Sequence, residues 1–237
     1  LLNPKLKKVG NPIGLLAHIE DYTLRELNLL NEIEGKERLE CLAEEYKHKF
    51  PMPKLRFPKI WKELSNEQVL VVEEITSPTL ESHLNSATMD WEDLLQLFRI
   101  HGAFMFGMGV FHGDLHPGNA MMTKNKDFIF IDTGAICEAP SHVRKALFGF
   151  FYFLAKGELR NAFDAMLTMA DVTPTGNTLD TYYASMHELY DGFVGTSVSE
   201  VSLTEQMMKT VKASVLAGCS FGEDAFPIIR SLMYMDG

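Results

Sequence analysis

Residues 112–119, with the sequence HGDLHPGN, constrain the fold of this chain more than any other segment. The segment contains a Pro-Gly turn, and two short apolar runs follow at 119–123 and 127–132, on either side of a polar turn. Apolar runs separated by such a turn predict an antiparallel hairpin. Because a hairpin brings its two open ends together, we expect Asn119 and Asp132 to lie side by side.

The chemistry of these side chains points to phosphoryl transfer. The amide of Asn119 and the carboxylate of Asp132 supply oxygen ligands of the kind that Mg²⁺ prefers, and this ion commonly also holds phosphates. Asp114 precedes them in the loop, where its carboxylate could accept the proton of an attacking hydroxyl. The order HxDxxxxN, strand, DxG is that of the catalytic and metal loops of kinases. The segment therefore predicts a kinase-like fold that binds ATP and Mg²⁺.

Two other interpretations of the same loop stay open. Alternate side chains of an extended chain share a face, so His112, Asp114 and His116 could bind zinc. That interpretation supplies no obvious fourth ligand and leaves the pairing of Asn119 with Asp132 unexplained. The loop could also be structural, with solvated histidine and aspartate side chains. Within the kinase interpretation, we expect His112 to be a hydrogen-bonded structural residue rather than a base.

The N-terminal part of the chain predicts helices followed by strands. Apolar spacing indicates helices at 15–30 and 36–49, and three prolines then interrupt residues 50–58. Two runs rich in β-branched residues, 58–65 and 68–75, predict another antiparallel hairpin.

The remainder of the chain is mainly helical. A short helix is expected at 80–84 and a longer one at 91–109, with Asp90 as its N-cap. Ser141 is expected to cap the helix after the metal loop, and Gly157 to end it. The five C-terminal helices are expected at 141–156, 158–170, 178–193, 203–217 and 224–235. Strands and helices are thus segregated, which indicates an α+β protein.

Composition limits the function classes. The chain has 237 residues, a net charge of −10 and a pI near 5.3, so we expect no nucleic-acid partner, since phosphate binding needs clustered lysine and arginine. The three cysteines lie far apart and form no CxxC pair, which favours a reducing compartment. No apolar run is long enough to cross a bilayer. We therefore expect a cytoplasmic protein, or one that is membrane-associated on the reducing side.

The motifs and their flanks resemble a known family. "FHGDLHPGNAMM" with "FIFIDTGA" resembles both the aminoglycoside/choline kinases and the UbiB/ADCK family of atypical kinases. "FPKIWKELSNEQVLVVEEI", the helical stretch that follows the metal loop and the ending "FPIIRSLMYMDG" are similar to the UbiB/ADCK family. The resemblance runs from about residue 18 to the C-terminus. It implies a protein-kinase-like fold, with a partial N-lobe at 1–76 and a mainly helical C-lobe at 77–237.

The resemblance also implies roles for single residues. Asp114 matches the catalytic-loop aspartate, and Asn119 and Asp132 match the metal ligands. Glu26 matches the N-lobe helix glutamate that pairs with the nucleotide-binding lysine, although a solvated helix charge is the alternative. The hinge, whose main chain would hold the adenine of ATP, matches Val72, Glu73, Glu74 and Ile75.

Three departures from the family pattern affect these roles. The chain contains no KxGQ motif, no alanine-rich nucleotide loop and no lysine strand before the helix with Glu26. It is therefore expected to be either a fragment or a degenerate member. Glu20 matches the first acid of an ExD motif, but Tyr22 stands at the second position. Thr133 replaces the usual phenylalanine of the metal loop, while the metal-binding aspartate is kept.

The family implies an atypical kinase or ATPase of the UbiB type, linked to isoprenoid quinone (ubiquinone) biosynthesis. The chain would bind ATP and Mg²⁺, and its other partners would be membrane lipids or quinone-pathway proteins. One alternative is a non-catalytic scaffold that binds a lipid or a partner protein, since the lysine is missing. The other is a small-molecule phosphotransferase of the aminoglycoside/choline type, with an acidic pocket from Asp171, Asp180, Glu188 and Asp191.

Overall fold

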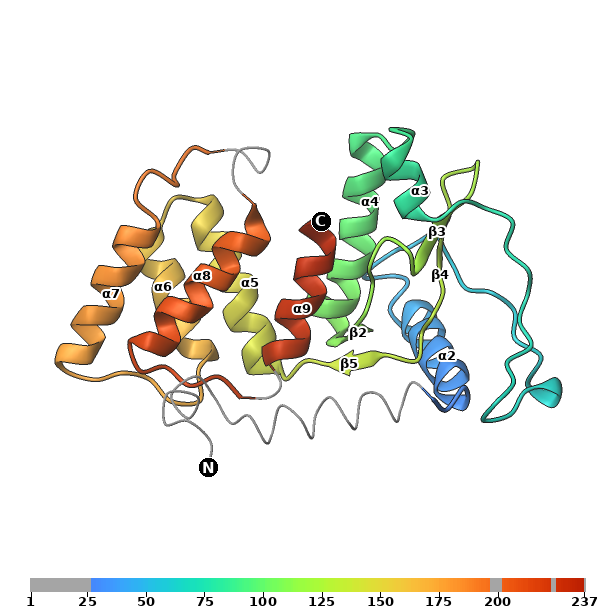
Figure 1. The fold of residues 1–237 in the computed structure, drawn as a ribbon, viewed down its shortest axis with the longest axis horizontal. Helices are drawn as coiled ribbons and strands as arrows, with labels where there is room; N and C mark the ends of the chain where they lie inside the picture. The colour runs from blue at the N-terminus through green and yellow to red at the C-terminus, as the bar shows by residue number, and fades with distance from the viewer. Residues whose placement is uncertain (1–26, 197–201, 223–224, 237) are drawn as a thin grey trace, which may run out of the picture. The chain divides into compact units, whose positions relative to one another are not determined.

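The structure is a computed structural model, and it describes residues 27–196, 202–222 and 225–236 (Figure 1). The described residues form two compact units. The first contains residues up to 97 and residues 117–136, and the second contains residues 98–116 and those from 137 onward. Helices and short strands occur together, as predicted for an α+β protein. The predicted lobe boundary at residue 76 stays a prediction.

The first unit combines helix α2 (Leu30–Glu45) with a three-stranded sheet in the order β1-β4-β3. Strands β3 (Ala120–Met122) and β4 (Phe128–Phe130) are antiparallel, which confirms the hairpin predicted around the metal loop. Strand β1 (Leu55–Arg56) pairs with β4 in parallel. Two of the buried core side chains, Phe128 and Phe130, come from β4.

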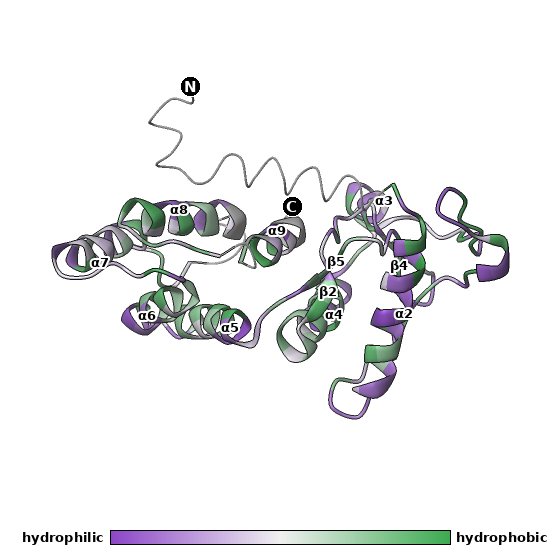
Figure 2. Ribbon diagram, turned by 90° about the horizontal axis from the view of Figure 1, so that it is seen from below, coloured by the Kyte–Doolittle hydropathy of each residue, from purple (hydrophilic) through white to green (hydrophobic). Residues whose placement is uncertain are grey.

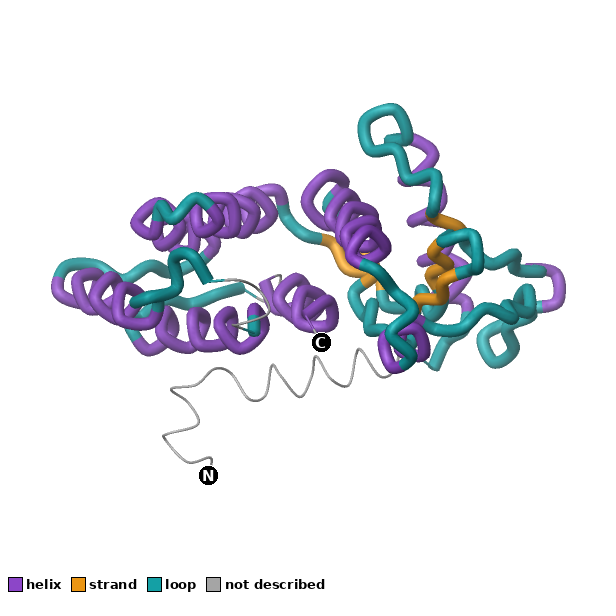
Figure 3. The backbone as a smooth tube through the Cα atoms, turned by 90° about the horizontal axis from the view of Figure 1, so that it is seen from above, coloured by secondary structure: helices purple, strands orange, loops and turns teal. Residues whose placement is uncertain are grey.

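The second predicted hairpin is present as separate bridges rather than long strands. The amide of Trp61 donates to the carbonyl of Val71 (2.9 Å), and that of Glu73 to the carbonyl of Lys59 (2.8 Å). The 3₁₀ helix η2 (Lys62–Leu64) interrupts the first run. Figure 3 shows how short the strands are in the described part of the chain.

Two helices follow in the first unit, and both begin with side-chain caps. The hydroxyl of Thr79 accepts from the amide of Ser82 at the start of α3 (Leu80–Asn85). At the start of α4 (Trp91–Gly102), Asp90 accepts from the amide of Asp93 (2.9 Å). The predicted cap at Asp90 is therefore confirmed.

The second unit begins within α4 and is mainly helical. A π-helix, η3 (Ala103–Met108), continues α4 and ends at Gly109, whose φ of 83° suits glycine. Strand β2 (Val110–His112) pairs with β5 (Ile136–Glu138). The following helices are α5 (Ser141–Ala155), α6 (Leu159–Met169), α7 (Asn177–Leu189), α8 (Leu203–Leu216) and α9 (Ala225–Asp236).

These helices match the predicted ranges closely, and their core is aromatic. The ring of Tyr190 lies edge-on to that of Phe150 and tilted against that of Phe163. Figure 2 shows that the helices carry both hydrophobic and hydrophilic residues. Pro140 rather than Ser141 occupies the N-cap position of α5, and no side chain caps that helix. The predicted cap was therefore wrong, whereas the predicted end at Gly157 has the expected φ of 72°. No helix among the described residues is both long and apolar enough to span a bilayer.

Candidate functional site

The metal-loop hairpin brings the two predicted ligands together. Asn119 directly precedes β3 and Asp132 lies two residues beyond β4. The amide of Ile131 donates to the carbonyl of Asn119 at 3.0 Å, so the two open ends of the hairpin are held side by side. Asn119 is buried while Asp132 is exposed. Their roles as metal ligands stay predictions.

Asp132 has an unusual backbone conformation. Its φ is 54°, in the left-handed region that residues other than glycine, asparagine and aspartate rarely adopt. Such conformations persist where surrounding contacts over-determine them, and they gather at functional sites. The main chain therefore turns sharply at Asp132, two residues beyond β4.

A second carboxylate, from Glu32 of helix α2, lies against Asp132. Burial of Glu32, and then the negative charge of Asp132, raise the pKa of Glu32 to about 7. Hydrogen bonds from the main chain of Gly134 and Thr133 act in the opposite direction but are weaker. Two carboxylates in contact repel each other when both are ionised, so a bound cation would relieve this repulsion.

The contact between α2 and the metal loop needs two glycines. A Cβ atom at Gly35 would lie 1.9 Å from the carbonyl oxygen of Thr133. A Cβ atom at Gly134 would lie 2.5 Å from Oε1 of Glu32. A side chain at position 35 would require the backbone to move, whereas a side chain at position 134 would displace the end of the Glu32 side chain. Helix α2 and the metal loop therefore fit closely in shape, although their two carboxylates repel each other when both are ionised.

Thr133, which stands where the family has phenylalanine, also joins these two elements. Its side chain is buried, and its hydroxyl donates to the main-chain oxygen of Glu32 at 2.9 Å. The apolar packing of a phenylalanine is thus replaced by a hydrogen bond to helix α2.

Sequence reasoning missed Glu32. It assigned the helix glutamate to Glu26, which lies outside the described residues, so that assignment is not tested. The signal that could have found Glu32 is its spacing from Gly35, because residues three apart share a face of a helix. A glutamate beside a glycine on one helical face permits both a charge and a close backbone approach.

Asp114 lies in the second unit, in the loop after β2. Its side chain is half-buried, and its amide donates to Nδ1 of His112 at 3.2 Å. His112 is buried, and this bond is that of a structural residue, as expected. Asn119 and Asp132 belong to the first unit. That all three residues act on one phosphate therefore stays a prediction.

The zinc alternative finds no support. Among the described residues, which include His112, Asp114 and His116, no group of three or more histidine, cysteine or acidic side chains is placed to hold a metal ion. That loop instead makes hydrogen bonds within itself, since the amide of His116 donates to the carbonyl of Asp114 at 2.8 Å.

The predicted hinge lies on the second strand of the bridged hairpin. Val72 pairs with Ile60, and Val72 is 41% exposed. The carboxylate of Glu73 accepts from the amide of Lys59 at 3.0 Å and contacts the guanidinium of Arg56. These bonds, with that from Lys59 the stronger, lower the pKa of Glu73. Contact of the hinge with adenine stays a prediction.

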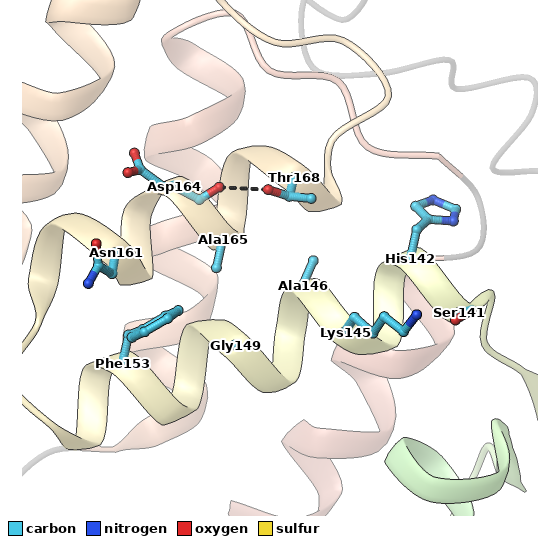
Figure 4. Close-up of a pocket in the computed structure, with 10 residues that line it drawn as sticks. All are labelled: Ser141, His142, Lys145, Ala146, Gly149, Phe153, Asn161, Asp164, Ala165 and Thr168. Atoms are coloured by element: carbon cyan, nitrogen blue, oxygen red, sulfur yellow. Dashed lines mark hydrogen bonds between the residues drawn. The ribbon is translucent and has the colours of Figure 1, made fainter.

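A pocket in the second unit contains none of the predicted site residues. It lies between α5 and α6 and measures about 800 Å³ (Figure 4). Ala146 of α5 and Ala165 of α6 face each other across the pocket, and most of the other residues that line it are polar. The lining includes Ser141, His142, Lys145, Ala146, Gly149, Phe153, Asn161, Asp164, Ala165 and Thr168.

Comparison with protein families and curated sequences agrees with the kinase interpretation. The model of the ABC1 atypical kinase-like domain matches residues 2–166. The chain is 22% identical over 247 residues to the "Probable protein kinase UbiB" of Pasteurella multocida, with 99% of this chain and 45% of that protein covered. It is 21% identical over 218 residues to an uncharacterized protein of the hydrogenase 1 5' region of Clostridium pasteurianum, with 91% and 40% covered. The chain thus spans less than half the length of these relatives.

A solved structure has a similar fold. The Mycobacterium tuberculosis protein Rv3197, determined in complex with erythromycin, superposes with a TM-score of 0.57 at 15% identity. The match covers 96% of this chain and 58% of Rv3197. At this identity, the similarity shows a shared kinase-like fold and nothing about ligands. The predicted fold class is confirmed.

Proposed function

The chain belongs to the ABC1 family of atypical kinase-like domains, and on this premise we propose that it binds ATP with Mg²⁺ and supports phosphoryl transfer or ATP hydrolysis. The observation that supports the proposal is the metal-loop hairpin, whose open ends carry Asn119 and Asp132 and are held together by the bond from the Ile131 amide to the Asn119 carbonyl. The donors fit Mg²⁺, because they are hard oxygen ligands and a cation would offset the repulsion between Asp132 and Glu32.

In this proposal each residue has one task. Asn119 and Asp132 hold the ion, which supplies positive charge against the phosphates of ATP. Asp114 orients the attacking hydroxyl or water and accepts its proton. Glu26 would pair with the nucleotide-binding lysine that the resemblance implies, although this sequence has no family-type lysine strand before it. The charge of Glu32 would be offset by the bound ion. Val72, Glu73, Glu74 and Ile75 would contact the adenine through their main chain.

The acceptor and the biological setting are also part of the proposal. The similarity to proteins named UbiB supports a role linked to ubiquinone biosynthesis, with quinone-pathway proteins or membrane lipids as partners. A second candidate is a non-catalytic scaffold with the same fold that would bind a lipid or a partner protein.

The test is nucleotide binding by the whole chain, measured by titration calorimetry with and without Mg²⁺. We expect Mg²⁺-dependent binding that is lost in Asp132→Asn and kept in Asp114→Asn. We expect hydrolysis of ATP, followed by phosphate release, to be lost in both variants. Binding that is unchanged in Asp132→Asn would overturn the metal assignment. Binding without hydrolysis in the unmodified chain would favour the scaffold.

A further inference from the structure

Two residues of the C-terminal helix contact the loop that carries Asp114. The hydroxyl of Ser231 donates to the carbonyl of His112 at 3.3 Å, and Nη2 of Arg230 donates to the carbonyl of Gly113 at 3.2 Å. Both side chains come from α9, more than a hundred residues away in the sequence, and all of these residues lie in the second unit. The two carbonyls that they bind are those immediately before Asp114.

A buried histidine completes the network. Nε2 of His101, in α4, lies 2.9 Å from the hydroxyl of Ser231. His101, Ser231 and His112 are all buried, at 2%, 0% and 1% exposure. Buried polar side chains cost stability unless they are hydrogen-bonded. Apolar side chains could fill this space without needing hydrogen-bond partners. The hydrogen bonds of His101 and Ser231 therefore serve to hold the His112 carbonyl in place rather than only to fill the core.

The chemistry of the three groups fixes the direction of each hydrogen bond. Burial, and then the nearby His112, lower the pKa of His101 to about 3, so its ring is neutral at physiological pH. A carbonyl can only accept, so the single proton of Ser231 goes to the oxygen of His112. Ser231 must then accept from His101, which places the ring proton on Nε2. Among the described residues, Nδ1 of His101 has no hydrogen-bond partner.

We propose that Ser231 and Arg230 are positioning residues that hold Asp114 by clamping the two peptide units before it, with His101 orienting Ser231. The inference rests on the proposed function of Asp114. The loop between β2 and β3 contains only turns, and side chains of α9 supply hydrogen bonds to the carbonyls of His112 and Gly113. The bond from the Asp114 amide to His112 adds a third contact to the same two peptide units, immediately before the catalytic position.

The first test measures the loop itself and needs no activity. Hydrogen–deuterium exchange with mass spectrometry on the whole chain would follow the amides of residues 113–116 in Ser231→Ala and Arg230→Met. The matched control is Ser214→Ala, because Ser214 is equally buried and its hydroxyl donates to a main-chain carbonyl, that of Thr210 in α8. We expect exchange in the loop to become at least several-fold faster in the first two variants and to stay unchanged in the control.

The conservative variants guard against simple misfolding. Ser231→Thr keeps the hydroxyl and Arg230→Lys keeps a cationic donor, so both are expected to restore slow exchange in the loop. Unchanged exchange in Ser231→Ala and Arg230→Met would overturn the proposal. So would equal acceleration in Ser214→Ala, because the effect would then be one of general loosening.

The second test asks whether the clamp matters for chemistry. In Mg²⁺-dependent ATP hydrolysis, Ser231→Ala should lower kcat by about 10-fold to 100-fold and leave KM for ATP unchanged, since misplaced reacting groups lower the rate without removing the nucleotide site. A rise in KM with unchanged kcat would contradict positioning of Asp114. If the unmodified chain hydrolyses no ATP, the proposed function fails, while the exchange experiment still decides whether the clamp exists.

Discussion

The contact between Glu32 and Asp132 leads to a prediction about stability. The unfolded chain releases the proton of Glu32 near pH 4.5, whereas the folded chain holds it until about pH 7. The free energy of unfolding therefore falls as the pH rises from about 4.5 to about 7, and Glu32 lowers it no further above that pH. Glu32→Gln removes the charge and keeps an amide that can donate to Asp132 and accept from the main chain of Gly134. We expect this variant to be more stable than the unmodified chain at pH 8.

The size of the effect follows from the pKa of Glu32. The difference of about 2.5 between the folded and ordinary values corresponds to roughly 3.4 kcal/mol, at about 1.36 kcal/mol per pH unit. Glu32 is only half-buried, so solvent screening reduces the electrostatic free energy. We therefore expect Glu32→Gln to raise the free energy of unfolding by about 1–2 kcal/mol at pH 8, and by close to zero at pH 4.5.

The free energy of unfolding is measured with urea at several pH values between 4.5 and 8, in the presence of a chelator that removes divalent ions. Glu34→Gln is the control, because Glu34 lies on the same helix but is exposed. Only Glu32→Gln should show a difference from the unmodified chain that grows with pH. A difference of the same size at pH 4.5 and at pH 8 would refute the electrostatic reasoning. Mg²⁺ should shrink the difference, since the ion stabilises the ionised pair.

Three other substitutions test the same region. Gly35→Ala should lower the free energy of unfolding by about 1–3 kcal/mol, because its Cβ would overlap the carbonyl of Thr133. Thermal unfolding measures this loss, and Gly102→Ala, in an uncrowded position, is the control. Thr133→Val keeps the shape but removes the hydroxyl that donates to Glu32, so urea unfolding should show a loss of about 1 kcal/mol. Leu39→Ala leaves a cavity beneath α2 and should cost about 2–5 kcal/mol by the same assay, whereas a cost near zero would show that α2 is not packed on this core.

Local patterns were sufficient for much of the fold. The hairpin of β3 and β4 follows from apolar runs and a turn only four residues long, and the C-terminal helices follow from helical spacing. The parallel pair of β1 with β4 was missed, because its partners are far apart in the chain and prolines flank β1. No local signal specifies such a pairing.

The candidate site could be predicted in part for the same reason. Asn119 and Asp132 are neighbours across one short hairpin, so their approach could be inferred from the sequence. Glu32 reaches Asp132 from a separate helix, and Ser231 reaches His112 from the end of the chain. These contacts depend on tertiary packing, which spacing within a motif does not reveal. The left-handed backbone of Asp132 is likewise imposed by its surroundings.

The first unit is built from two separate stretches of chain, and this has a consequence for the order of synthesis. Residues up to 97 leave the ribosome before the stretch 98–116, which belongs to the other unit, and only then does β4 emerge. Until that moment β1 has no partner strand and α2 has no metal loop to pack against. Domains generally fold as units during synthesis. The N-terminal stretch must therefore wait until residues 98–136 have also been synthesised. A nascent chain stopped at residue 97 should be open to proteases, whereas one stopped beyond residue 136 should be protected.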